Sequence, residues 1–171
     1  MTPEQRAARI RLVVLDVDGV LTDGRLYYGP QGEAIKVFDV RDGHGIKMLL
    51  GRGIEVAILS ARDSPIVAQR ARELGIARVL QGRGDKAQAF NDLLAETKIS
   101  ADETAFVGDD LPDLPVLQQA GLAATVHDAR DEVKAVAHWI APQPGGRAAV
   151  RAIAEFILRA QAVDITAMVH G

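Results

Sequence analysis

Short runs of apolar residues alternate along most of the chain with longer stretches whose apolar positions recur every three or four residues. Uninterrupted runs bounded by turn residues are typical of buried strands, and the longer spacing is typical of helices that pack on one side. The runs are, in chain order, "IRLVVL", "IEVAIL", "ARVL", "TAFV", "LAATV" and "HWIA". Strands that alternate with helices predict an α/β fold with a doubly wound, Rossmann-like parallel sheet.

Residues that commonly begin and end helices support this pattern. Ser64 and Pro65 can form the N-cap and first turn of the helix "SPIVAQRARELG", and Gly75 can end it. Asp85 can cap "KAQAFNDLLAET" in the same way. Near the C-terminal end, several apolar residues share one helical face, which predicts a helix docked on the sheet. These residues are Val150, Ile153, Ala154 and Ile157.

One segment breaks the alternation of strands and helices. The stretch "RLYYGPQGEAIKVFDV", residues 25–40, has two β-prone parts around "GPQG", and this pattern favours a hairpin over a helix. We therefore expect a β-hairpin of about residues 25–40 that protrudes from the sheet.

Length and charge exclude several classes of function. At 171 residues the chain has about the length of one domain, so we expect a single domain over residues 1–171. The net charge of −3 and the aromatic content of 4% disfavour a nucleic-acid surface, which needs clustered cations and stacking rings. A small-molecule partner is the expectation that remains.

The apolar runs and the missing cysteines bear on location. Every run is far shorter than the roughly 18 apolar residues of a membrane span, and the N-terminal residues lack the apolar core of a signal sequence. Without cysteine, the chain has no disulfide framework and no thiolate site, which fits a reducing compartment. We expect a cytoplasmic protein with no membrane partner.

Two groups of acidic residues follow predicted strands. In "LVVLDVDGVLTDG", Asp16 and Asp18 are two positions apart, so both can face one point beyond the strand. The later stretch "FVGDDLPD" supplies Asp109, Asp110 and Asp113. Aspartate also caps turns after strands, and either group alone fits that role. If the two strands are neighbours, both groups meet at the ligand-binding edge of the sheet and form a site for Mg²⁺.

Two further residues suit phosphate chemistry. Ser60 ends the run "VAILS" and can donate a hydroxyl hydrogen bond, and Lys86 begins a predicted helix and can place a positive charge on the same phosphate. Taken singly, each also fits a turn residue or a solvated charge. Their order along the chain, between the two acidic groups, favours the functional interpretation.

These four motifs together resemble the haloacid dehalogenase superfamily. The resemblance implies an aspartyl-phosphate mechanism in which Asp16 attacks phosphorus and Asp18 acts as acid and then as base. It also implies that Asp16, the carbonyl of Asp18 and Asp109 hold Mg²⁺, and that Ser60 and Lys86 belong to the catalytic set. Phosphate monoesters hydrolyse very slowly in water, so catalysis must neutralise the negative charge on the transferring oxygens. A metal and a lysine would supply this neutralisation.

The gaps between the motifs are too short for the cap domain that many members of the superfamily insert. The chain therefore resembles a capless member, and an open site of that kind would depend on neighbouring subunits.

Within the superfamily, the chain resembles the 3-deoxy-D-manno-octulosonate 8-phosphate phosphatases, which serve lipopolysaccharide synthesis. The matching stretches are "DVDGVLTDGRLYYGPQGEAIKVFDVRDGHGIKML", "IEVAILSARDS", "LQGRGDK", "VGDDLPDLPV" and "PGGRAAVRAI". This resemblance implies a homotetramer in which hairpins associate and a C-terminal helix and tail, about residues 143–171, reach a neighbour's site. By position it implies substrate contacts from Asp18, Asp39, Val40, Arg41, Asp42, Gly43, Lys47, Arg62, Arg70, Lys86 and Arg147.

The chain departs from the family pattern at several of these positions, which leaves substrate detail more open than chemistry. Aspartate stands at 39 where asparagine is familiar, Ala61 replaces a glycine, His44 replaces an aromatic residue and Lys47 replaces an arginine. Ala148 follows Arg147 where glycine is common.

Three other interpretations are weighed against this one. A phosphorelay receiver domain would carry its phosphorylated aspartate where Ser60 stands. An inactive relative that serves as a binding or assembly module would share the fold, but here all four motifs are intact. A sister phosphatase for a nine-carbon keto-acid sugar 9-phosphate would share every motif.

Overall fold

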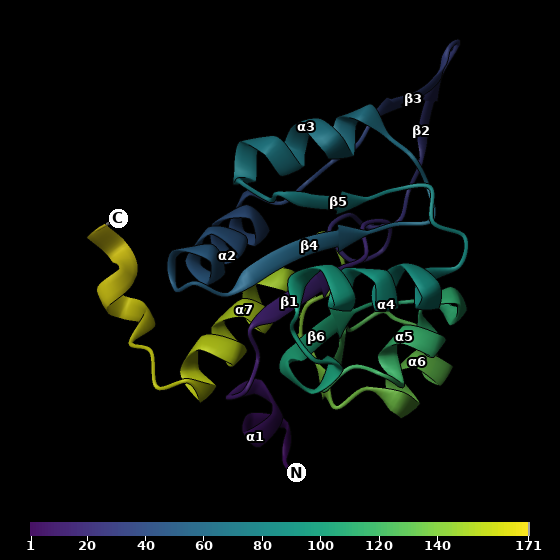
Figure 1. Cartoon of the computed structure of the whole chain (residues 1–171). Coiled ribbons are helices and arrows are strands. Elements are labelled where there is room, and N and C mark those ends of the chain that lie inside the picture. The colour runs from purple at the N-terminus through teal and green to yellow at the C-terminus, as the bar shows by residue number, and fades with distance from the viewer. Residues whose placement is uncertain (171) are drawn as a thin grey trace.

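A six-stranded parallel sheet with the strand order β5-β4-β1-β6-β7-β8 forms the centre of the molecule (Figure 1). It is seen in a computed structural model that describes residues 1–170, so the last residue of the predicted C-terminal segment 143–171 lies outside the described residues. Each predicted run contains one strand, which confirms the α/β parallel fold. The strands are β1 (Leu12–Leu15), β4 (Glu55–Leu59), β5 (Arg78–Leu80), β6 (Thr104–Val107), β7 (Leu122–Thr125) and β8 (Trp139–Ile140).

Helices lie in two groups around this sheet. Helix α7 contacts both α1 and α2, and α3 contacts α2, whereas α5 contacts both α4 and α6. The helices are α1 (Pro3–Ala7), α2 (Val40–Gly51), α3 (Pro65–Leu74), α4 (Lys86–Thr97), α5 (Leu114–Leu117), α6 (Asp131–Val136) and α7 (Ala149–Ala160). Three 3₁₀ segments are η1 (Ala101–Glu103), η2 (Leu111–Asp113) and η3 (Ile165–His170). None of the helices within residues 1–170 combines the length and apolar character needed to cross a membrane.

The predicted helix boundaries lie where the sequence places them, with one difference. Gly75 ends α3 with a φ of 81°, and the Asp85 side chain accepts a hydrogen bond from the backbone N–H of Gln88 at the start of α4. Ser64 occupies the N-cap position of α3, but its hydroxyl forms no capping hydrogen bond. It donates instead to Glu33 of the hairpin, at 2.6 Å.

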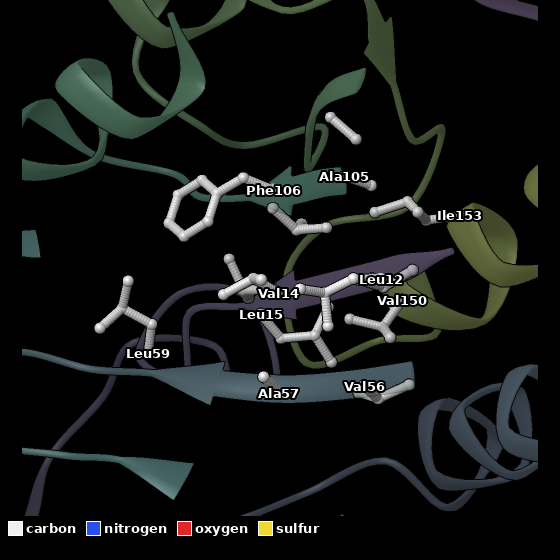
Figure 2. Packing of buried hydrophobic residues seen from close by; sticks show 14 of the residues in the cluster. Leu12, Val14, Leu15, Val56, Ala57, Leu59, Ala105, Phe106, Val150 and Ile153 are labelled. Atoms are coloured by element: carbon white, nitrogen blue, oxygen red, sulfur yellow. The ribbon is translucent and has the colours of Figure 1, made fainter. Parts of the chain in front are cut away.

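The core forms where the central strands meet the helices. Residues of β1 and β6 are fully buried, and Val150 and Ile153 of α7 lie beside Leu12 of β1 (Figure 2). Parallel strands covered on both faces read as continuous apolar runs, which is why the sequence pattern located them. The order of the strands reverses beside β1, so the ends of β1 and β6 form the edge where ligands bind in open sheets.

The hairpin is real but shorter than expected. It consists of β2 (Tyr27–Gly29) and β3 (Gly32–Ile35), which pair antiparallel and project from the sheet at the upper right of Figure 1. The predicted range of 25–40 is therefore too long, because the chain leaves the strand after Ile35 and begins α2 at Val40. Large apolar side chains are exposed along this segment, at Leu26, Tyr27, Tyr28, Ile35, Val37 and Val40.

Candidate active site

The turn after β1 places the first acidic pair. The backbone N–H of Asp16 donates to the carbonyl of Val107 in β6, so the two strand ends are tied together at 2.9 Å. The chain then turns at Gly19, which has a φ of 91°. A Cβ at this position would lie 2.1 Å from Asp109 Oδ2, so only glycine lets the turn come this close to the second acidic group.

Three carboxylates and one lysine meet at this edge. Oxygen atoms of Asp16, Asp109 and Asp113 lie within 4.8 Å of one another. Lys86 Nζ is 3.0 Å from Asp16 Oδ1 and 2.6 Å from Asp113 Oδ1. Asp113 Oδ2 also accepts hydrogen bonds from the backbone N–H groups of Asp109, at 3.0 Å, and Asp110, at 3.3 Å. Asp113 therefore braces both the lysine and the loop.

The electrostatics of the cluster call for a further positive charge. Burial, together with the neighbouring carboxylates Asp16, Asp113 and Asp110, raises the pKa of Asp109 to about 8. Burial and Asp113 raise the pKa of Asp16 to about 6, although Lys86 opposes the shift. Burial alone would lower the pKa of Lys86, but the carboxylates of Asp16 and Asp113 raise it. One ammonium group thus faces three carboxylates, and a divalent cation would balance them.

The donor set fits Mg²⁺. Oδ1 of Asp109 is buried and has no hydrogen-bond partner among residues 1–170, so it is free to bind a cation. Asp16 offers a second carboxylate at the same point, whereas both oxygens of Asp113 already have donors. Magnesium binds through one or two protein carboxylates and keeps several waters, which matches Asp16 and Asp109.

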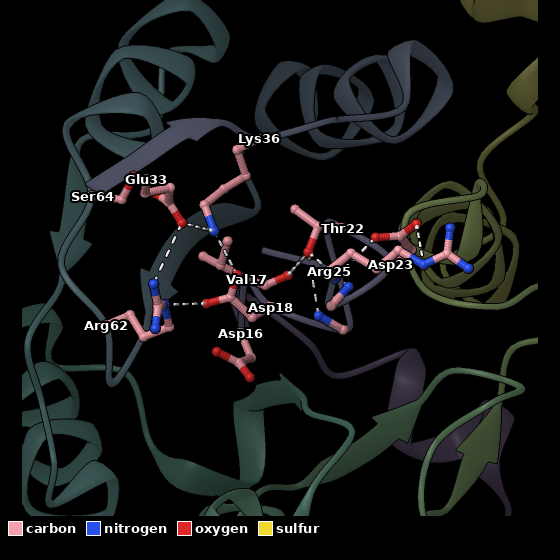
Figure 3. A network of polar contacts seen from close by, with 12 residues as sticks. Asp16, Val17, Asp18, Thr22, Asp23, Arg25, Glu33, Lys36, Arg62 and Ser64 are labelled. Carbon is pink, nitrogen blue, oxygen red and sulfur yellow. Dashed lines mark hydrogen bonds and ion pairs between the residues drawn. The ribbon is translucent and has the colours of Figure 1, made fainter. Parts of the chain in front are cut away.

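The carboxylate of Asp18 faces the hairpin instead of the other acids. Its Oδ1 lies 2.6 Å from Lys36 Nζ and its Oδ2 lies 3.6 Å from Arg62 Nε. Glu33 lies beside both cations, 3.0 Å from Lys36 and 3.6 Å from Arg62. Figure 3 shows Asp18 turned toward these cations while Asp16 points the other way. Only the backbone carbonyl of Asp18 is thus left for a metal at the Asp16 side.

An open cleft of about 330 Å³ lies over these groups. Ser60, at the end of β4, is buried and lines it, as the sequence predicts for a residue that follows a strand. We call this cleft the aspartate cleft. Its lining residues are Asp16, Asp18, Gly24, Ser60, Ala61, Arg62, Asp109, Asp110, Pro112 and Asp113.

A second cleft of about 330 Å³ lies next to the first, beyond the Asp23–Gly24 turn. Asp39 caps α2 and also holds the guanidinium of Arg41 at 2.7 and 3.1 Å. This pairing leaves part of Arg41 at the cleft. We call this second cleft the arginine cleft. Its lining residues are Asp23, Val37, Phe38, Asp39, Arg41, Gly146 and Arg147.

The remaining predicted substrate contacts lie on α2 and α3, outside the two clefts. Val40 and Lys47 are exposed on α2. Asp42 is 2% exposed and accepts a hydrogen bond from the Arg151 backbone of α7 at 2.8 Å, so it joins two helices.

Gly43 and Arg70 mark the contact of α2 with α3. Gly43 is buried, and a Cβ there would lie 2.5 Å from Arg70 Nη2. Arg70 itself pairs with Glu73 at 3.4 Å and stacks over the ring of Phe38. The structure therefore does not bring Gly43 or Arg70 to the carboxylate cluster.

The glycines before α7 support the site within the same chain. A Cβ on Gly145 would lie 1.8 Å from the carbonyl of Gly19, and the backbone N–H of Gly146 donates to Val20. The absence of side chains at these two positions lets the backbone pack against the turn after β1. Arg147 precedes the helix, which begins at Ala149.

Sequence reasoning missed Lys36 and Glu33. The two residues are three positions apart, so the two-residue period of a strand places them on opposite faces. They meet because β3 ends at Ile35, and Lys36 lies just beyond it. A lysine inside the apolar stretch "AIKVF" was the available signal, because a cation in such a place needs a partner.

Comparison with known proteins agrees with this geometry. Residues 72–153 match the family of haloacid dehalogenase-like hydrolases. The 3-deoxy-D-manno-octulosonate 8-phosphate phosphatase of Yersinia pestis is 46% identical over 157 residues, which are 92% of this chain and 84% of the relative.

Two solved structures superpose closely on this fold. The phosphatase of the same name from Moraxella catarrhalis, in complex with a magnesium ion, a phosphate ion and a KDO molecule, has a TM-score of 0.91 at 40% identity. The match covers 94% of this chain and 92% of that one. The cobalt-bound phosphatase from Haemophilus influenzae has a TM-score of 0.91 at 45% identity and covers 92% of each chain.

Proposed function

Since this chain belongs to the haloacid dehalogenase-like hydrolases, we propose that it is a Mg²⁺-dependent phosphatase that hydrolyses 3-deoxy-D-manno-octulosonate 8-phosphate. The observation that supports the chemistry is the cluster of Asp16, Asp109, Asp113 and Lys86 under an open cleft. The products are inorganic phosphate and the free eight-carbon sugar acid, a precursor in lipopolysaccharide synthesis.

The reaction proceeds in two steps on the side chains of this cleft. A carboxylate oxygen of Asp16 attacks phosphorus, and the bond from phosphorus to the sugar oxygen breaks. Asp18 gives its proton to that leaving oxygen, so the sugar departs as an alcohol. A water then attacks phosphorus of the aspartyl phosphate, Asp18 takes a proton from this water, and Asp16 is released with inorganic phosphate.

Three further groups prepare these steps. Lys86 is held by Asp113 and places its ammonium beside the attacking oxygen of Asp16. Ser60 lines the cleft and can donate to a phosphate oxygen. Magnesium, held by Asp16, Asp109 and the carbonyl of Asp18, would neutralise charge on the transferring oxygens.

The arginine cleft is proposed to receive the sugar acid. The substrate carries a carboxylate at the end opposite its phosphate, and arginine binds carboxylates through paired hydrogen bonds. Arg41 and Arg147 line this cleft, and Arg62 lines the aspartate cleft. Asp39 also lines the arginine cleft, and Val40, Lys47 and Arg70 are proposed as outer contacts from α2 and α3. The burial of Asp42 and Gly43 supports a role for these two in holding α2 in place.

We propose a homotetramer in the cytoplasm. The exposed large apolar side chains between residues 26 and 40 support the assembly, since apolar surface of this kind is typical of protein interfaces. The absence of cysteine from the sequence supports the location. Light scattering should give four times the mass of one chain, and a fully active monomer would contradict the proposal.

Phosphate release from a panel of keto-acid sugar phosphates tests the function. With Mg²⁺, we expect the eight-carbon 8-phosphate to give the highest kcat/KM, and a higher value for the nine-carbon 9-phosphate would select the sister activity instead. Asp16→Asn should remove phosphate release without unfolding the chain, because an amide is a poor nucleophile. Asp92→Asn, an exposed site on α4, is the matched control. Wild-type protein without phosphatase activity on any ester would indicate a binding or assembly module.

A further inference from the structure

A continuous set of polar contacts joins α3 to Asp18 through the hairpin. The hydroxyl of Ser64, at the start of α3, donates to Glu33 Oε2 at 2.6 Å. The other oxygen of Glu33 lies 3.0 Å from Lys36 Nζ, and Lys36 donates to Asp18 Oδ1 at 2.6 Å. Figure 3 shows these side chains converging on Asp18 from the hairpin side.

The two hairpin residues are placed too deeply to be ordinary surface charges. The side chain of Lys36 is 2% exposed and that of Glu33 is 13% exposed. Burying such a pair costs solvation free energy that a surface pair does not, so it does not arise as a simple stabilising device. Ser64 also gives up its capping bond to α3 in order to hold Glu33. Breaking a local rule in this way is typical of functional sites.

Lys36 differs from the other cation at Asp18. The side chain of Arg62 is 42% exposed and lines the aspartate cleft, so a substrate can reach it. Lys36 does not line either cleft, and its ammonium is enclosed by Asp18 and Glu33. It can therefore act on the reaction only through Asp18.

We propose that Lys36, held by Glu33, is a positioning residue that fixes the Asp18 carboxylate for proton transfer to the leaving group. The proposal rests on the proposed function, in which Asp18 is the acid of the first step. Lys36 binds Oδ1, and this leaves Oδ2 as the oxygen that faces the cleft beside Arg62. Without Lys36, the carboxylate can rotate and the proton no longer points to one place.

A pair of aryl phosphates separates this role from general support of the fold. Phenyl phosphate and p-nitrophenyl phosphate have nearly the same shape, but phenol is the poorer leaving group and needs the acid more. The value of kcat/KM covers the steps up to the first irreversible one, which here is transfer to Asp16. For Lys36→Met we expect kcat/KM to fall about 10- to 100-fold with phenyl phosphate. The fall with p-nitrophenyl phosphate should stay below about threefold.

Lys98→Met is the matched control. Lys98 is exposed at the end of α4, and the same substitution there should leave both values unchanged. Equal losses on both esters for Lys36→Met would show a structural role and overturn the proposal, and so would no loss on either.

A second variant covers the case in which Lys36→Met does not fold, since it leaves the buried Glu33 without its cation. The double variant E33Q/K36M removes both charges together and should fold while showing the same selective loss with phenyl phosphate. Equal rates of the double variant and wild type on phenyl phosphate would overturn the inference. Failure of the proposed function looks different, because the wild type and Lys98→Met would then release no phosphate from either ester.

Discussion

Magnesium binding should depend steeply on pH, because the cation competes with a proton on Asp109. Burial and neighbouring carboxylates raise the pKa of Asp109 from its ordinary value of 3.8 to about 8 in the metal-free fold. The folded state therefore holds a proton that the unfolded chain has lost, over the range from about pH 4 to pH 8. Stability of the metal-free protein accordingly falls as the pH rises through this range. Bound Mg²⁺ removes the penalty, since it replaces the proton.

The size of the effect follows from the window between pH 6 and pH 8. One pKa unit corresponds to about 1.4 kcal/mol, and the proton on Asp109 is nearly fully bound at pH 6 and half bound at pH 8. The metal-free protein should lose on the order of 2 kcal/mol over these two units, and Mg²⁺ should bind roughly 50-fold more tightly at pH 8. For a chain of this length, saturating Mg²⁺ should raise Tm by roughly 4–8 °C more at pH 8 than at pH 6.

Thermal unfolding with and without Mg²⁺ at pH 6, 7 and 8 measures this difference directly. Calorimetric titration at pH 7 in two buffers of different ionisation enthalpy should show release of about one proton per Mg²⁺. Asp109→Asn is the control, since it should remove both the proton release and most of the affinity. A Mg²⁺ effect on Tm that is equal at all three pH values, or largest at pH 6, would refute the assignment of Asp109 as a ligand.

Two further substitutions test the supports of the site, and a third tests the end of α4. Asp113→Ala leaves Lys86 with one carboxylate and should lower the free energy of unfolding by about 3 kcal/mol in urea titrations; an unchanged value would contradict the bracing role. Gly19→Ala places a methyl group against Asp109 and should weaken Mg²⁺ binding at least about tenfold by calorimetry. An unchanged affinity would contradict the contact between this turn and Asp109. Lys98→Gly should raise Tm, with a gain of up to about 1 kcal/mol, because Lys98 has a φ of 57° that glycine adopts freely. A lower Tm would show that Lys98 makes contacts that outweigh this strain.

The sequence predicts most of the fold because its main signals are local. Strands β1, β6 and β7 are buried along their whole length, so apolar runs mark them. Gly75 and Asp85 mark helix ends through their own backbone and side-chain chemistry. The hairpin length was less well determined, because the β-prone residues after Ile35 continue past the end of the strand.

In the candidate site too, the residues marked by local signals could be predicted, and those that depend on tertiary contacts could not. The sequence places Asp16 and Asp109 after two strands and predicts that they meet if those strands are neighbours, which β1 and β6 are. The role of Asp113 could not be predicted, because an aspartate that caps a turn and one that holds Lys86 look the same in the sequence. The lysine inside "AIKVF" indicates a cation that needs a partner, but its contact with Asp18 depends on how the hairpin folds back, which no short pattern encodes.

The packing of Gly145 and Gly146 against the turn after β1 has a consequence for synthesis of the protein. The turn that carries Asp18 is made early in translation, whereas the segment that supports it is made near the end. Contacts between distant parts of a chain form late in folding, because a long loop must close first. A nascent chain on the ribosome can therefore pair its early strands before its active site is complete. Premature termination anywhere before Gly145 leaves this turn unsupported, so truncated products should accumulate as inactive polypeptides that cannot compete for the substrate.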